Sequence, residues 1–500
     1  MFKTVTAETM RAIDSHMINE IGIPSLVLME NAAGAVCRAV LEAAATRGGG
    51  IAILCGIGNN GGDGLALLRQ LAMNGVSAAA YIVGDASHMS DDCKTQLNIA
   101  LRLGLNCIFA DESYDFHAFS DFDIIVDAIF GTGLKREIKG AARKAIDAAN
   151  DSAAFKISID IPSGIDSDLG LIRGVAFRAD ETVAIQYKKR GHLLFPGREY
   201  SGNVRVVKIG LSASDTDERI TERELEFSDI KALLPPRRQD THKGCNGKAL
   251  LIAGSDDLTG AAIMSTRAAL RSGAGLLKVF TAAGAAAILR TCLPEAMTSV
   301  GTADCWTTFD KSQLEGLIDW CDCIAIGPGI GHGHAVADML SLVISCGKPL
   351  IIDADGLNAL ARQGSSALHE NVLLTPHLGE MSRLCAKPME SIKAEQLAHA
   401  AAYAKKTRAN VLLKGATSII VSPDGRVTYN TSGNPALAKG GSGDMLTGII
   451  LALCGQIGDV YDSACAGSFI LGQSADTALD ILNERFIIAG DVTDAVQLFS

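Results

Sequence analysis

The sequence predicts an α/β protein of two domains, each built on a mainly parallel sheet. Short apolar segments that suit buried strands alternate with segments of helical periodicity, a pattern typical of parallel sheets covered by helices on both faces. The chain has 500 residues, whereas a single core rarely grows beyond roughly 300 residues. Its 48% hydrophobic content, 52 glycines and 5% aromatic residues are those of a compact enzyme rather than a disordered or fibrous chain.

The first half opens with two helices and continues as a Rossmann-like alternation. The first helix has an N-cap at Thr6 and ends before Gly22 and Pro24, because these residues stop a helix. Its apolar face carries Met10, Ile13, Met17 and Ile21. The second helix covers residues 25–45. Ser90 caps a later helix that stops at Gly104. The predicted strands are residues 51–54, 79–83, 124–130, 156–159, 182–185 and 204–209.

A charged segment separates the halves. Residues 214–224 are charged and free of glycine, and Pro235 and Pro236 stiffen the chain shortly after them. We therefore place the boundary near residues 212–222, which gives domains of residues 1–215 and 222–500. The strand and helix alternation then restarts, so the second half is another α/β domain. Its predicted strands are residues 248–253, 324–326, 349–352, 372–374 and 411–413.

Composition excludes several classes of partner. The formal net charge of -11 argues against broad binding of nucleic acid or anionic membranes. No apolar run approaches the ~20 residues needed to span a bilayer, and the N-terminus has no hydrophobic signal region. The 13 cysteines are scattered without a CxxC pair, which indicates reduced and mostly buried thiols. We expect a cytoplasmic homo-oligomer.

One glycine-rich stretch near the end of the chain combines an anion site with a carboxylate. Residues 438–448 read AKGGSGDMLTG, and an apolar run comes directly after them. A loop that leads into a buried helix presents unpaired amides to an anion, and glycine lets the backbone approach a phosphate closely. Asp444 would repel that phosphate unless it acts as the base for an attacking hydroxyl. The alternative is a glycine-rich turn in which Asp444 only complements the helix dipole.

A second glycine loop comes after the first strand of the chain. Residues 55–64 read CGIGNNGGDG and satisfy GxGxxG, while Asp85 lies at about the distance expected of a carboxylate that binds ribose. An NAD-dependent dehydrogenase is therefore one alternative. Against it, Asn59, Asn60 and Asp63 crowd a loop that should offer bare backbone to a pyrophosphate. A lone GxGxxG is weak support.

Further polar groups stand at the ends of predicted strands. In the first half these are Asp127 with the glycine loop 131–137, and Asp160 with Ser163. In the second half they are residues 242–244, 254–255, 327–331, 353–358, 375–380 and 414–418. Each alone is more often a turn or capping residue. Together they point to one cleft in each sheet, since ligands of parallel sheets bind at the carboxyl ends of strands.

In the first half, GNNGGDG, VDAIFGTG and DIPSGID resemble the NAD(P)H-hydrate epimerase domain of the bifunctional NAD(P)H-hydrate repair enzymes. The resemblance covers roughly residues 1–212 and includes MENAAG at 29–34. It implies that Asp160 faces the reacting ring and is catalytic. It also implies a potassium ion held by Asn60, Asp127 and Ser163, whose oxygen ligands suit an alkali cation. The hydrated nucleotide would contact Asn59, Asn60, Gly61, Gly62, Asp63, Gly131, Thr132, Gly133, Leu134, Lys135, Arg136, Glu137 and Asp160.

From about His242 to the end, the chain resembles the ribokinase-like, ADP-dependent dehydratase domain of the same family. The family usually has proline after the histidine of this motif, and here Leu378 follows His377. The resemblance implies that the adenine nucleotide contacts Lys414, Gly415, Ala416, Thr417, Ser418 and Gly443, and that the hydrated cofactor contacts Ala262, Gly329, His377 and Asp444. The resemblance implies a contact from one residue of a turn at Gly260–Ala262, and we assign it to Ala262, although it does not decide among the three residues of the turn.

The resemblance implies a repair reaction on NADH hydrate and NADPH hydrate. ADP would phosphorylate the added hydroxyl, Asp444 would take its proton, and loss of phosphate would restore the ring and leave AMP. The first domain would interconvert the two epimers, of which only one is dehydrated. Magnesium is expected on the nucleotide from phosphoryl-transfer chemistry. Two alternatives remain: a kinase for a small alcohol in the second half, and a binding module without activity in the first.

Overall fold

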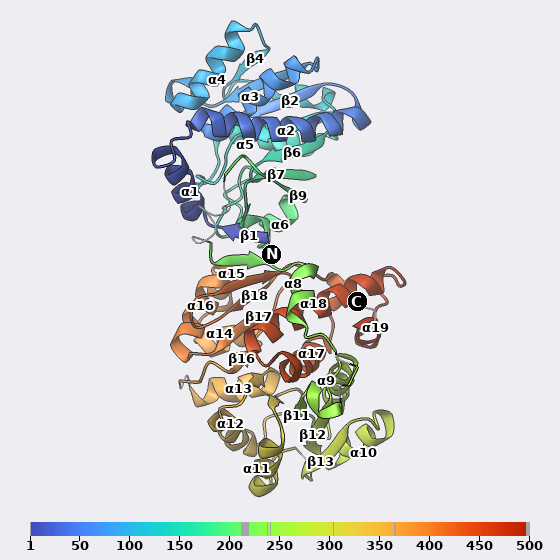
Figure 1. Ribbon diagram of the computed structural model, residues 1–500. Coiled ribbons are helices and arrows are strands. Elements are labelled where there is room, and N and C mark those ends of the chain that lie inside the picture. The colour runs from blue at the N-terminus through green and yellow to red at the C-terminus, as the bar shows by residue number, and fades with distance from the viewer. Residues whose placement is uncertain are drawn as a thin grey trace. The chain divides into compact units, whose positions relative to one another are not determined.

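The protein is described by a computed structural model, in which residues 2–211, 220–237, 239–240, 242–303, 305–364 and 367–496 are placed well enough to describe. The chain divides into two compact units, residues 2–221 and 222–500 (Figure 1). The core of the charged segment predicted at the boundary, residues 212–219, lies outside the described residues.

The first unit is built on a seven-stranded sheet with the order β4-β3-β2-β5-β6-β7-β9, in which all neighbours are parallel. A short parallel pair, β1 with β8, stands apart from these seven strands. The strands are Phe2–Val5 (β1), Ile51–Cys55 (β2), Ala78–Val83 (β3), Cys107–Ala110 (β4), Ile124–Ala128 (β5), Phe155–Ile159 (β6), Glu181–Ile185 (β7), Lys188–Lys189 (β8) and Asn203–Val207 (β9). The α-helices are Ala7–Asn19 (α1), Ser25–Arg47 (α2), Asn59–Met73 (α3), Asp91–Arg102 (α4), Gly140–Asp151 (α5) and Gly197–Tyr200 (α6).

Both faces of this sheet are buried, which explains its nearly continuous apolar strands. Alternate residues of β2 point to opposite faces. Ile51 and Ile53 pack with residues of α2, α3 and α4, whereas Ala52 and Leu54 pack with α5 and with a cluster of aromatic rings around Tyr81. The strand order reverses direction beside β2, whose neighbours are β3 and β5. A crevice for a ligand is expected at the carboxyl ends of strands at such a point.

The second unit repeats this architecture with the strand order β13-β12-β11-β14-β15-β16-β17-β18-β19-β10. Its strands are Glu222–Glu224 (β10), Lys248–Ile252 (β11), Leu276–Ala282 (β12), Met297–Thr302 (β13), Cys323–Ile326 (β14), Leu350–Ile352 (β15), Val372–Leu374 (β16), Asn410–Leu413 (β17), Ser418–Val421 (β18) and Val427–Asn430 (β19). Neighbouring pairs are parallel except β17 with β18 and β18 with β19.

The helices of the second unit cover this sheet. They are Phe227–Leu233 (α8), Thr259–Arg271 (α9), Ala283–Cys292 (α10), Lys311–Trp320 (α11), Ala335–Ser345 (α12), Ala354–Gln363 (α13), Leu378–Cys385 (α14), Met389–Ala394 (α15), Gln396–Thr407 (α16), Ser442–Ile457 (α17), Val460–Leu479 (α18) and Ala489–Ala495 (α19). Helix α17 packs against α9 and α18, and an uninterrupted run from Met445 to Cys454 is buried. A helix that is apolar all round must lie inside the protein, whereas residues 442–444 in the first turn of α17 are half-buried.

The predicted α/β fold class is confirmed, and each predicted strand overlaps an observed one. Several strands were missed. In β12, Lys278 interrupts the apolar pattern, and its ammonium instead lies 4.2 Å from the centre of the Trp320 ring. The first helix also ends earlier than expected, at Asn19, and Ile21 is 51% exposed rather than part of the apolar face.

Two predictions from composition can be compared with the structure. All 13 cysteines are free thiols and most of them are buried. None of the helices in the described ranges combines the length and the apolar character needed to cross a lipid bilayer.

Candidate active sites

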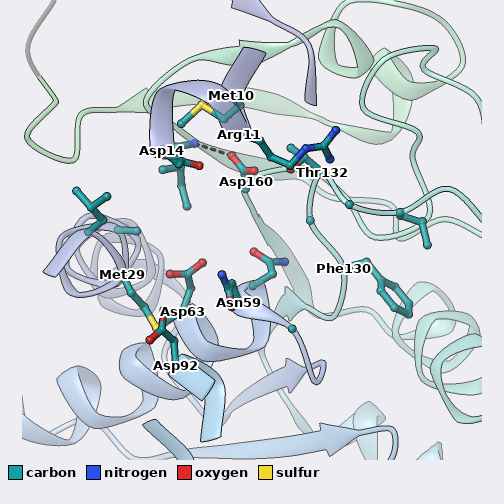
Figure 2. A pocket seen from close by; sticks show the side chains of 18 of the residues that line it. Met10, Arg11, Asp14, Met29, Asn59, Asp63, Asp92, Phe130, Thr132 and Asp160 are labelled. Carbon is teal, nitrogen blue, oxygen red and sulfur yellow. Dashed lines mark hydrogen bonds between the residues drawn. The ribbon is translucent and has the colours of Figure 1, made fainter. Parts of the chain in front are cut away.

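A cavity of about 790 Å³ opens at the carboxyl ends of β2, β5 and β6 in the first unit. Its walls come from α1 and α2, the first turn of α3, the loop after β5, and Asp160 after β6 (Figure 2). The predicted residues that line it are Asn59, Asn60, Asp63, Gly131, Thr132, Gly133, Leu134, Lys135, Arg136 and Asp160. A volume of this size suits a nucleotide.

Three predicted contacts do not line this cavity. Gly61 and Gly62 are buried in α3, and Glu137 is exposed outside the lining residues. The two glycines serve packing, because a Cβ on Gly61 would lie 1.9 Å from the carbonyl oxygen of Gly56, and one on Gly62 would lie 2.6 Å from Met29. Their assignment as substrate contacts therefore stays a prediction that rests on the resemblance.

The geometry also weakens the dehydrogenase alternative. Asn59 and Asn60 are the first residues of α3 rather than part of a bare loop. Asp85 does not line the cavity; its exposed carboxylate accepts a hydrogen bond from the Ser87 amide at 2.9 Å and caps a short helical turn. The GxGxxG pattern arises here from close packing of α3 on the sheet.

Asp160 is held in an unusual conformation by a buried lysine. Its φ is 67°, in the left-handed region that is uncommon for residues other than glycine, and such backbone strain gathers at functional sites. Its carboxylate accepts hydrogen bonds from the Ile185 amide at 3.0 Å and from Lys189 Nζ. The Lys189 side chain is 1% exposed and was not recognised from the sequence. The Asp160 side chain also lines the cavity.

Asp127 and Ser163 form a buried network beneath the cavity. The fully buried Asp127 carboxylate accepts hydrogen bonds from the Ser163 hydroxyl at 2.5 Å, the Ser163 amide at 2.7 Å, the Ser158 hydroxyl at 3.0 Å and the Ile129 amide at 3.2 Å. All four donors are neutral. Burial raises the pKa of Asp127, as expected for a buried carboxyl group whose four donors are neutral.

The assignment of Asn60, Asp127 and Ser163 as ligands of an alkali cation stays a prediction, which the chemistry of their side chains supports. The Asn60 Nδ2 atom is buried and has no hydrogen-bond partner among the described residues. The Asn60 side chain lies beside Gly131, since a Cβ built there would be 3.8 Å from Asn60 Oδ1. A half-turn of the amide would present its oxygen instead. An amide oxygen, a carboxylate and a hydroxyl are the donor types that a hard cation prefers.

Carboxyl groups from other elements also reach the cavity. Asp14 comes from α1, Asp63 from α3 and Asp92 from α4. Burial raises the pKa of Asp14 to about 6, an effect that the Lys189 ammonium opposes and the Asp160 carboxylate reinforces. Burial, together with the charges of Asp160, Asp14 and Asp92, raises the pKa of Asp63 well above its ordinary value. Asp14 and Asp92 were missed because each lies outside any loop motif.

In the second unit, the predicted glycine loop leads into α17. Gly441 has a φ of 97° at the N-cap, and a Cβ there would lie 2.3 Å from the Met264 sulfur. Asp444 is the third residue of the helix, where first-turn amides and the dipole favour an anion. The cation next to this loop in sequence, Lys439, does not serve the anion, because its Nζ donates to the carbonyl groups of Arg485, at 3.0 Å, and Ile487.

Asp353 organises this second site. Its carboxylate is 1% exposed and accepts hydrogen bonds from Lys414 Nζ at 2.7 Å, Thr375 Oγ1 at 2.8 Å and Thr447 Oγ1 at 2.7 Å. These donors come from the ends of β16 and β17 and from α17. Burial favours a raised pKa for Asp353, but the Lys414 charge and the three hydrogen bonds hold the pKa below its usual value.

Asp353 also acts on the predicted base. Burial raises the pKa of Asp444 to about 6; the Asp353 carboxylate adds to this rise, while Lys414 opposes it. A Cβ on Gly443 would lie 3.4 Å from Lys414 Nζ, so the ammonium lies beside the first turn of α17. The sequence marked Asp353 only as a polar strand end.

His377 is the N-cap of α14 and remains 55% exposed. Its Nδ1 accepts a hydrogen bond from the Gly379 amide at 3.0 Å, and its own amide donates to Glu380 at 2.8 Å. Burial and the charge of Lys414 lower the pKa of His377, which favours a neutral ring. The local capping box therefore orients the histidine, and Leu378 begins the helix.

The remaining predicted contacts surround this site to different degrees. Gly329 has a φ of 62°, and a Cβ there would lie 2.6 Å from the Leu258 carbonyl oxygen, so the loop after β14 lies against the start of α9. The Gly260–Ala262 stretch belongs to α9 and is not a turn. Ala262 is fully buried, whereas Gly260 is exposed and Ala261 is half-buried. These two are better placed than Ala262 to contact a ligand.

After Lys414, the chain turns into β18. Gly415 and Ala416 are exposed, Ser418 is half-buried and Thr417 is buried. The described residues contain no group of three or more histidine, cysteine, aspartate or glutamate side chains arranged to hold a metal ion. The predicted potassium ligands Asn60, Asp127 and Ser163 include only one such side chain, Asp127, so this result does not concern them.

The fold is that of an α/β enzyme with two units, each of which gathers polar and charged side chains at the carboxyl ends of its parallel strands. The profile of the NAD(P)H-hydrate dehydratase family matches residues 249–493, and that of the YjeF-related protein N-terminus matches residues 25–191. A bifunctional NAD(P)H-hydrate repair enzyme from Thermofilum pendens is 36% identical over 96% of this chain and 92% of its own length. The chain belongs to the family of bifunctional NAD(P)H-hydrate repair enzymes.

Two further comparisons agree. The repair enzyme of the same name from Moorella thermoacetica is 35% identical over 98% of this chain and 95% of its own length. Among solved structures, a ribokinase-like superfamily protein from Enterococcus faecalis is 27% identical, with a TM-score of 0.50, and covers 56% of this chain and 95% of its own.

Proposed function

We propose that this protein repairs hydrated NADH and NADPH, with an epimerase site in the first unit and an ADP-dependent dehydratase site in the second. The observation that carries the proposal is the similarity to repair enzymes along nearly the whole chain. Because both halves match, the alternative of a small-alcohol kinase fused to an inactive binding module receives no support.

In the first unit, the cavity beside Asp160 would hold the nicotinamide end of the hydrated cofactor. The hydroxyl group stands on the ring carbon next to the nitrogen, so its departure leaves a planar cation that water can attack on either face. The carboxylates around the cavity would stabilise that cation electrostatically. Exposed Lys135 and Arg136 at the edge of the cavity would attract the phosphates.

In the second unit, ADP would phosphorylate the hydroxyl of one epimer. Asp444 takes the hydroxyl proton, and the first-turn amides of α17 stabilise the phosphoryl group as it moves. Lys414, which lies beside Gly443, would neutralise phosphate charge. The phosphate ester then eliminates phosphate, because phosphate is a better leaving group than hydroxide, and the dihydronicotinamide ring is restored with AMP left behind.

Two cations are part of the proposal. Asn60, Asp127 and Ser163 would hold a potassium ion, whose positive charge would balance the buried Asp127 carboxylate. Magnesium would bind the nucleotide phosphates, since it is usually held by few protein ligands together with substrate phosphates.

The proposal is tested with purified protein and a mixture of both hydrate epimers. Absorbance of NADH should rise when ADP and magnesium are added, and both epimers should be consumed. If the absorbance rises with neither epimer, the dehydratase assignment is contradicted. Phosphorylation of a simple alcohol, without release of NADH, would restore the kinase alternative.

A further inference from the structure

Asp14 is a carboxyl group of the epimerase cavity that no motif includes. It lies on α1, before the residues 25–191 that the family profile matches. Its side chain lines the same cavity as Asp160. Both residues are labelled in Figure 2, where the dashed line that ends at Asp160 is the hydrogen bond from Lys189. A catalytic role for Asp14 rests on the proposed epimerase function and adds a further residue to it.

Departure and return of a hydroxyl group require two opposite proton transfers. The leaving oxygen must receive a proton to depart as water, and the returning water must lose one. Hydroxide itself is a poor leaving group, so a general acid has to be present. Two carboxyl groups can share this work when their environments keep one protonated and the other ionised.

Asp160 is placed for the ionised role. It is paired with Lys189, which is buried and also donates to the Ile185 carbonyl oxygen at 2.9 Å. The Ile185 amide donates to the same carboxylate. A carboxylate that already accepts hydrogen bonds from an ammonium and a backbone N–H is placed as an acceptor, so another group is needed to deliver the first proton.

Asp14 is placed for the protonated role. The charged groups that act on it are Lys189 and Asp160, and Asp14 in turn acts on Asp63 of α3; Arg11 on its own helix also lines the cavity. Burial among these carboxylates raises the pKa of Asp14 to about 6. At neutral pH, part of the population of Asp14 carboxyl groups therefore carries a proton that can be donated.

We propose that Asp14 is the proton donor of the epimerase site and works as a pair with Asp160. Asp14 gives its proton to the hydroxyl oxygen, the carbon–oxygen bond breaks with its electron pair, and water leaves. The ring nitrogen lone pair forms the carbon–nitrogen double bond of the cation. Water then adds to either face of that carbon, and the Asp160 carboxylate takes the released proton. Exchange of this proton with solvent or with Asp14 restores the starting state.

The test uses the full chain with Asp14→Asn, which keeps the shape and removes the acid. Epimerisation is measured by chromatographic separation of the two epimers without ADP, corrected for the spontaneous reaction. We expect a loss of at least ~100-fold, the usual scale for general acid catalysis. Glu8→Gln removes one charge from the same helix at an exposed position and should leave the rate unchanged.

Three further measurements keep the result interpretable. Dehydration of the reactive epimer with ADP should be normal in Asp14→Asn, which shows that the chain is intact. Asp14→Glu, which keeps a carboxyl group, should recover part of the rate. In the unaltered protein, kcat/KM for epimerisation should fall as pH rises above about 6, and this limb should be lost in Asp14→Asn.

Epimerisation by Asp14→Asn within a few-fold of normal would overturn the assignment. The assignment would also be overturned if the fall of kcat/KM at higher pH disappeared in Asp63→Asn but remained in Asp14→Asn, because the acid would then be Asp63. If the unaltered protein fails to epimerise the hydrate at all, the proposed function fails instead. The two failures are therefore distinguishable.

Discussion

The buried carboxylate of Asp353 and the partly buried ammonium of Lys414 lie 2.7 Å apart in an ion pair, although 60 residues stand between them in the chain. Lys414 lies beside the first turn of α17 and also 3.9 Å from Glu380. Burial favours a lowered pKa for Lys414, but Asp353 and Glu380 raise its pKa above the usual value. The pair therefore fixes a positive charge where the proposed nucleotide phosphates would lie.

Replacement of Asp353 by Asn should weaken both stability and dehydration. The change leaves Lys414, whose side chain is 18% exposed, with Glu380 at 3.9 Å as an acidic neighbour. We therefore expect a cost of about 3 kcal/mol in the free energy of unfolding, at the lower end of the range for a broken buried pair. Denaturant unfolding and NADH release measure the two effects. Thr375→Val, which removes one hydrogen bond and keeps the ion pair, should cost only about 1 kcal/mol. Equal effects of the two variants would show that the charge of Asp353 has no special role.

Replacement of Asp444 by Asn should slow dehydration by at least ~100-fold, because the general base is lost. Binding of ADP, measured by calorimetry, should change little. Near-normal turnover would mean that Asp444 serves only as a first-turn residue of α17 that complements the helix dipole.

The pH dependence of dehydration depends on the same residue. The base must be ionised to accept a proton, and the pKa of Asp444 is raised to about 6. The kcat for NADH release should therefore rise as pH increases through about 6 and level off above it. Since Asp353 contributes to the raised pKa, Asp353→Asn should move this limb to lower pH. A profile that stays flat on both sides of pH 6 would argue against Asp444 as the base.

Replacement of Asp160 by Asn should abolish epimerisation and leave ADP-dependent dehydration of the reactive epimer unaffected. With both epimers supplied, the variant should stop at partial conversion, apart from slow spontaneous epimerisation. The expectation rests on the location of Asp160 and Asp444 in different compact units. Rapid, complete conversion would show that Asp160 is not catalytic, and loss of dehydration would show that the units do not act separately.

Exchange of potassium for lithium should lower epimerisation more than dehydration. The reason is the buried Asp127, whose four donors are all neutral and whose carboxylate would lose a cation of the right size. Parallel assays of both reactions in each salt, with magnesium held constant, measure the effect. An epimerisation rate that is the same in both salts would remove the potassium ion from the proposal.

The sequence alone determined the fold class and much of each site, because these depend on local patterns. Apolar segments of strand length mark buried parallel strands, and polar or glycine residues just after them mark the sheet edge where ligands bind. Asp160, Asp444 and the 131–136 loop could be found in this way. The family resemblance added the reactions to these positions.

Tertiary structure decided which charges oppose or support these residues. Lys189 of β8 reaches Asp160, which follows β6. Asp353 reaches Lys414 across β16, and α1 brings Asp14 to a cavity formed mostly by later segments. It also showed that Gly56 and Gly61 permit close packing. The physical reason is that ion pairs, desolvation and backbone contacts depend on distances between segments far apart in the chain, whereas periodicity reports only neighbours along it.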